Sequence, residues 1–237
     1  MPEQKSEYPI KVTDERLIKR ITIMGVFSDV FSMFNIERGL VYTLKLLFSN
    51  PGVLLNLYLK EGRYLIFNSF RLLILTTAIS LLAMRLISPE DFLRGFAEGM
   101  NNYDSPDQID ILEYEAWISD WYNLILWTAI PLYALFSYLF NRKQGYNYAE
   151  HVVMQSFHMS ALNIITTIFV VLVTLSNEVW LMSVMLMALV VYYFWMLLAW
   201  LKRYSFWFIF KNVLGYVIAN LLYLIGVGVA VALVFYE

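Results

Sequence analysis

The sequence contains no cysteine and only two histidines, and just 15% of its residues are charged. Without cysteine the chain can form no disulfide, no thiolate metal site and no cysteine nucleophile. Soluble domains carry about a quarter charged residues, so the low charge content argues against a soluble fold. The net charge of -2 provides no overall basic surface, and we therefore expect no nucleic-acid partner.

Motifs of the common enzyme classes are also missing. The chain has no G-x-S-x-G, no Walker loop, no H-E-x-x-H and no dinucleotide-binding fingerprint. Their absence leaves the question of an enzyme open but favours a protein without catalysis. We predict no catalytic residue, no metal site and no cofactor.

Long apolar stretches are abundant instead, since 60% of the residues are hydrophobic. A helix needs about 20 apolar residues to cross the hydrocarbon core of a membrane. Five stretches meet this requirement, and Pro131 is expected to kink the second of them. The sequence therefore predicts an all-α, polytopic membrane protein whose five-helix transmembrane domain covers residues 63–237, with spans at about 65–87, 121–140, 152–175, 179–201 and 213–236.

Residues 1–62 precede the first of these spans and contain no run long enough to cross a membrane. Four apolar residues, Leu40, Leu44, Leu47 and Phe48, fall on one helical face, and the triplet Asn-Pro-Gly at 50–52 ends that helix. We predict amphipathic helices in this cytoplasmic segment. They either lie in the membrane interface or pack on the cytoplasmic ends of the bundle.

Lysine and arginine are unevenly distributed among the connecting segments. Nine precede the first span, two lie between the second and third, and three between the fourth and fifth, whereas the acidic loop 88–120 contains only Arg94. Loops rich in these residues face the cytoplasm. We therefore predict a cytoplasmic N-terminus, an external acidic loop and an external C-terminus.

Both histidines lie where the third span begins, in the stretch GYNYAEHVVMQSFH at 145–158. On a helix, His158 is about 20° from His151 around the axis and about 10 Å further along it. This separation is too large for one metal ion, which favours ligands three or four residues apart. The spacing instead predicts a polar cluster at this helix entrance, consisting of Asn147, Tyr148, Glu150, His151, Gln155 and His158.

The two histidines have different expected environments. We expect His151 at the hydrated cytoplasmic mouth of the span and His158 inside the bundle, where an ionisable group is a functional candidate. His158 could form a hydrogen bond to a neighbouring helix, relay protons, contact a solute or help to bind a metal. A second polar face on this span, Ser156, Ser160, Asn163 and Thr167, predicts that the third span is central.

Two further features suggest binding of lipid or protein. Basic and polar residues at the start of the first span could hold a lipid phosphate, although snorkelling of Arg71 would explain them without a site. In the last span, small residues four apart permit close helix contact, inside the chain or in a homo-oligomer. The candidate lipid cluster is Arg63, Tyr64, Asn68 and Arg71, and the small pairs are Gly226/Ala230 and Gly228/Ala232.

The segment 35–75, and Tyr148-x-Glu150-His151 followed by His158 within 147–162, together resemble a family of uncharacterised bacterial integral membrane proteins. The first segment carries Arg63, Tyr64 and Asn68 in a motif that enters the first span. The resemblance implies the inner membrane and supplies no established activity. Many members begin with a zinc ribbon, which this cysteine-free chain lacks.

Three functions remain open from the sequence. The leading hypothesis is a non-enzymatic accessory or assembly protein that binds lipid or a protein partner. The alternative is a small-solute or ion transporter or channel, which would require a homo-oligomer because five spans contain no even inverted repeat. The third is an interfacial membrane enzyme with Glu150 or His151 as base.

Overall fold

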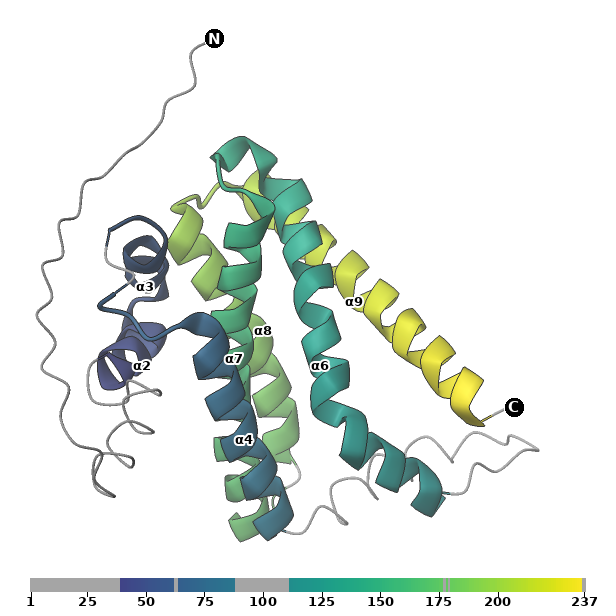
Figure 1. Ribbon diagram of the computed structural model, residues 1–237. Helices are drawn as coiled ribbons and strands as arrows, with labels where there is room; N and C mark the ends of the chain where they lie inside the picture. The colour runs from purple at the N-terminus through teal and green to yellow at the C-terminus, as the bar shows by residue number, and fades with distance from the viewer. Residues whose placement is uncertain (1–38, 62–63, 88–110, 177, 179, 236–237) are drawn as a thin grey trace, which may run out of the picture. The chain divides into compact units, whose positions relative to one another are not determined.

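The computed structural model describes residues 39–61, 64–87, 111–176, 178 and 180–235. Within these ranges the chain is helical and contains no strand (Figure 1). Any amphipathic helix before residue 39, Arg63 and the part of the predicted acidic loop at 88–110 lie outside the described residues. The all-α fold class is confirmed for the described residues.

Two short helices precede the long ones. α2 (Leu40–Ser49) and α3 (Pro51–Asn56) are followed by a π-helical turn, Leu57–Glu61. The break between them is where the sequence predicts it, since Pro51 opens α3 and the Asn50 side chain accepts a hydrogen bond from the Val53 N–H. The long helices are α4 (Ser69–Ile87), α6 (Ile111–Asn141), α7 (Tyr148–Ser176), α8 (Trp180–Leu201) and α9 (Phe206–Phe235).

Three of the long helices are sufficiently long and apolar to cross a membrane. They are α7, α8 and the part of α9 from Phe206 to Ala230. A membrane-embedded protein is therefore supported. α4 has a shorter apolar stretch, Ser69–Ala83, and α6 is not among the three.

Two helix starts differ from the predicted spans. The first helix begins at Ser69 rather than at 65, because the Asn68 carboxamide oxygen accepts the free N–H groups of Phe70 and Arg71, at 3.0 and 3.2 Å. The second begins at Ile111, inside the predicted loop 88–120. Beyond Pro106 the sequence has no glycine or proline until Pro131, so nothing interrupts helix formation there.

The last helix also begins earlier than predicted, at Phe206 instead of 213. The predicted span at 213–236 leaves Lys211 in the loop before it. Its ammonium group instead donates to the Phe140 carbonyl oxygen, 2.6 Å away at the end of α6. A lysine whose charge is satisfied in this way does not end an apolar helix.

α7 is the central helix, as its two polar faces predict. It packs against α4, α6, α8 and the shorter α2. α7 and α8 run antiparallel, because His158 stacks on Tyr192 while His151 contacts Trp200. α6 and α9 do so too, because Asn141 bonds to Asn212 while Tyr133 bonds to Asn220. Figure 1 shows that the five long helices alternate in direction along the chain. The α6–α7 and α8–α9 connections therefore lie at one end of the bundle, which we call the basic end.

The short helices pack on the bundle, α3 near the end of α8 and α2 further along it, so they are not confined to the ends of the helices as one of the two predictions had it. α3 lies against α8 so closely that a Cβ atom added to Gly52 would overlap the Ala199 carbonyl oxygen and lie 2.6 Å from its carbon. The Tyr192 hydroxyl donates to the Leu47 carbonyl oxygen of α2 over 2.9 Å. These two contacts fix the segment before the first long helix to α8.

α6 and α9 are joined at the basic end by a buried amide pair. Asn141 Nδ2 donates to Asn212 Oδ1 over 2.7 Å, and Asn212 Nδ2 donates back over 3.3 Å. The second proton of each amide goes to the carbonyl oxygen four residues earlier in its own helix. Every polar atom of the pair therefore has a partner.

The small residues of α9 divide between two environments. Gly215 lies against the Phe140 ring, and Ala219 is fully buried. Gly226 and Gly228 have open space where a side chain would be. Internal packing of α9 therefore uses the small residues of its first half, whereas the predicted small-residue face lies in the open second half.

Candidate functional site

Three of the predicted site residues hold the start of α7. The Asn147 N–H donates to Glu150 Oε2 over 2.7 Å, and the Glu150 N–H donates to Asn147 Oδ1 over 3.0 Å. This reciprocal pair is a capping box, and the carboxylate also favours the positive end of the helix dipole. The Tyr148 hydroxyl donates to the Pro131 carbonyl oxygen of α6. All three residues therefore stabilise the helix entrance.

His151 is fully buried, so the predicted hydrated environment is wrong. Ser137 Oγ of α6 lies 2.8 Å from its Nδ1, and the Trp200 ring of α8 lies 5.0 Å from the imidazole, centre to centre. Side chains from two other helices thus cover His151. The sequence predicts exposure because His151 is close to the charged residues Arg142 and Lys143. Among the described residues, Nε2 of His151 has no hydrogen-bond partner.

His158 points into the bundle, as predicted. It is 5% exposed, its ring stacks on Tyr192 at 6.1 Å, and Tyr193 meets it edge-on at 5.0 Å. Its Nε2 has no partner within the described part of the chain, so the expected interhelical hydrogen bond is not found at that atom. Gln155, one turn earlier, contacts the Tyr193 hydroxyl and leaves its Nε2 unpaired among the described groups.

The second polar face of α7 has a structural role. Ser156, Ser160 and Thr167 each donate to the carbonyl four residues earlier in the same helix. Asn163 donates to the hydroxyl oxygens of Thr76 and Thr77 in α4 over 3.3 and 2.9 Å. These bonds connect α4 and α7 through polar contacts inside an otherwise apolar interface.

The structure describes three of the four residues in the predicted lipid cluster. Arg63 lies outside the described residues. Asn68 caps α4 and also donates to the Tyr58 hydroxyl over 3.2 Å. Tyr64 and Arg71 are both exposed to the surroundings. Asn68 therefore shapes the helix start, while the two exposed side chains remain accessible.

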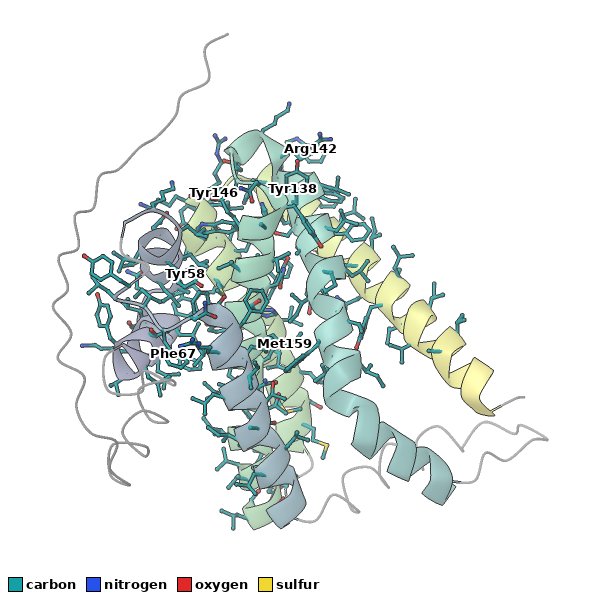
Figure 2. The ribbon with its side chains drawn as sticks, viewed as in Figure 1. Tyr58, Phe67, Tyr138, Arg142, Tyr146 and Met159 are labelled. Atoms are coloured by element: carbon teal, nitrogen blue, oxygen red, sulfur yellow. The ribbon has the colours of Figure 1, made fainter. Side chains whose placement is uncertain are left out.

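A cavity of about 480 Å³ opens at the basic end, and the sequence alone did not predict it. It lies among α3 with its π-helical turn, the α6–α7 connection and the end of α8. Of the lining residues, Tyr146 is labelled in Figure 2. Its polar lining consists of Asn56, Lys60, Gln144, Tyr146 and Lys202, and Val53, Leu57, Trp200 and Leu201 form the apolar part. The site is thus amphipathic and carries two positive charges.

One of these lysines has an uncommon backbone conformation. Lys202 follows the last residue of α8 and has a φ of 51°, in the left-handed region where glycine or asparagine is usual. Its N–H donates to the Leu198 carbonyl oxygen over 2.8 Å, which ends the helix. A lysine at this position therefore carries a conformational cost that a glycine would avoid.

A chain of aromatic contacts connects the cavity to the buried histidine. Lys60 Nζ lies 5.0 Å from the centre of the Tyr146 ring, which is 4.4 Å from the Trp200 ring. The Trp200 ring in turn contacts His151. Trp200 is 2% exposed, and its Nε1–H has no acceptor among the described groups. Trp200 thus lines the cavity, while its Nε1–H is enclosed by protein atoms.

The cavity belongs to a wider concentration of positive charge. Six cationic side chains lie in the segments that meet at this end: Lys60, Arg142, Lys143, Lys202, Arg203 and Lys211. Figure 2 shows Arg142 in the α6–α7 connection, and its guanidinium lies 5.8 Å from the Tyr138 ring. Aromatic and basic residues together are typical of a membrane–water interface.

Metal binding finds no support in the described ranges, where no group of three histidine or acidic side chains is close enough to hold an ion. Comparison of the chain with protein-family models, with curated proteins and with solved structures finds no match.

Proposed function

We propose that the chain is a non-enzymatic accessory protein of a cell membrane, which binds anionic lipid at the basic end of its helix bundle. The observation that carries this proposal is the gathering of Lys60, Lys202 and their cationic neighbours around an amphipathic cavity. Basic pockets between membrane helices are suited to anionic headgroups. The candidate residues at the start of α7 are engaged in capping and packing, which favours a binding role over catalysis.

The proposal includes five membrane spans, formed by α4, α6, α7, α8 and α9. The alternating directions of these helices support it, because each connection then reverses the chain between the two sides (Figure 1). The basic end faces the cytoplasm in this arrangement, since short loops rich in lysine and arginine remain there. The end of α9 lies on the other side.

A reporter fused after residue 237 tests the span count and the orientation together. An alkaline phosphatase fusion, active only outside the cytoplasm, should be active, and a green fluorescent protein fusion, which folds in the cytoplasm, should be dark. Fusions placed in the α6–α7 connection near Gly145 should give the opposite pattern and serve as the control. A fluorescent, phosphatase-inactive C-terminal fusion contradicts the five-span arrangement.

Lipid binding is tested on the full chain purified in mild detergent. Native mass spectrometry should show bound phospholipid, and the extracted lipid should be enriched in anionic species relative to the source membrane. The reason is that the cations gathered at this end attract anionic headgroups. Bound lipid with the same composition as the membrane would contradict the proposal.

A further inference from the structure

We infer that the cavity at the basic end is a site for one phosphate group, that of a phospholipid headgroup held between Lys60 and Lys202. The inference deepens the proposed function and rests on it. It replaces a general attraction of anionic lipid by one occupied site with a defined set of donors.

The first argument is the composition of the cavity wall. Two ammonium groups and the side-chain amides of Asn56 and Gln144 supply donors, and the Tyr146 hydroxyl supplies another. Among the residues that line the cavity there is no carboxylate, so nothing in the wall neutralises the two lysines. A phosphate oxygen pairs with such donors in charge-assisted hydrogen bonds, which are stronger than neutral ones.

The second argument is the position of the Lys60 charge. Its ammonium group lies 5.0 Å from the centre of the Tyr146 ring, and that ring lies 4.4 Å from the Trp200 ring. Both aromatic residues line the cavity. The cation–π contact therefore holds the Lys60 charge at the cavity wall.

The third argument distinguishes a lipid from a soluble phosphate. The wall also contains Val53, Leu57 and Leu201, and the cavity lies at the end of α8, which is long and apolar enough to span a membrane. A headgroup in the cavity would therefore place its acyl chains beside apolar surface. Free phosphate makes no favourable contact with an apolar wall, whereas a phospholipid contacts the polar part with its headgroup and the apolar part with its acyl chains.

The test titrates the purified full chain in detergent with phosphatidic acid, whose phosphate is exposed, and follows binding by native mass spectrometry. Phosphatidylcholine and inorganic phosphate are the comparison probes. Lys60→Gln with Lys202→Gln should weaken phosphatidic acid binding about tenfold or more, because two charge-assisted bonds are lost. The matched control, Lys143→Gln with Arg203→Gln, removes the same charge at the same end but outside the cavity. It should weaken binding clearly less than the cavity pair, because it removes only long-range attraction and no contact with the phosphate.

The remaining outcomes separate the inference from the proposed function. Equal weakening in the cavity and control variants shows diffuse attraction, which overturns the site and leaves lipid binding intact. Equal binding of phosphatidic acid and phosphatidylcholine by the unaltered chain overturns both. If millimolar inorganic phosphate displaces phosphatidic acid, and the acyl chains add nothing to the affinity, the cavity is a site for a soluble phosphate and the assignment to a phospholipid is overturned. Preference for phosphatidic acid that is lost only in the cavity variants supports the inference.

Discussion

Replacing Gly52 with alanine is expected to destabilise the protein by about 1–3 kcal/mol, the usual cost of overpacking a well-packed contact. The added Cβ would overlap the backbone carbonyl of Ala199. A backbone group cannot swing aside as a flexible side chain can, so α3 must move away from α8. Val53, Asn56 and Leu57, which line the cavity from the α3 side, would move with it.

The measurement is thermal unfolding of the two proteins in the same detergent, with lipid binding recorded in parallel. Gly226→Ala is the matched control, because that glycine lies in α9 and has open space around the added Cβ. It should leave stability unchanged or raise it by up to about 1 kcal/mol through helix propensity. Equal melting temperatures for Gly52→Ala and the unaltered protein would show that α3 does not approach α8 this closely.

Replacing one member of the buried amide pair, as in Asn212→Leu, is expected to cost about 1–3 kcal/mol, because Asn141 would keep a buried donor and acceptor without partners. Changing both residues to leucine should cost much less than the sum of the two single changes. Both unpaired amides are then removed, and leucine has nearly the same shape as asparagine.

A double-mutant cycle measures the coupling energy between the two asparagines directly. It compares Asn141→Leu, Asn212→Leu and the double variant by denaturant or thermal unfolding. We expect a coupling energy of about 1–2 kcal/mol, near the upper end for interhelical hydrogen bonds in membrane proteins. Asn220→Leu is a useful comparison. Asn220 accepts a hydrogen bond from the Tyr133 hydroxyl, and because this bond is only partly buried, the coupling energy between these two residues should be smaller. Additive single changes at 141 and 212 would contradict the paired arrangement.

The helical class and most helix positions followed from local signals in the sequence. Apolar runs of sufficient length located the long helices, and Pro51 marked a true boundary because its ring and missing N–H act on the residues beside it. The errors at Ile111 and Phe206 arose where charged residues continue a helix. Charge alone does not end a helix when a partner, such as the Phe140 carbonyl for Lys211, is supplied by another segment.

The site was less predictable, because its parts come from segments far apart in the chain. His151 is buried by Ser137 and Trp200, and no local pattern announces either neighbour. The cavity likewise needs α3, the α6–α7 connection and the end of α8 to meet. Asn212 did carry a signal, since an amide within an apolar run is costly in a membrane unless it is paired. Its partner could not be read from the sequence.

The bond from Tyr192 to the Leu47 carbonyl joins residues 145 positions apart. At a synthesis rate of about 5–20 residues per second, roughly 7–30 seconds separate the appearance of the two groups at the ribosome. During that interval α2 and α3 exist without the helix that they pack on, and the close approach at Gly52 cannot form. The earliest helices of the described chain are thus among the last to reach their final packing, and the cavity is completed only after α8 has been made.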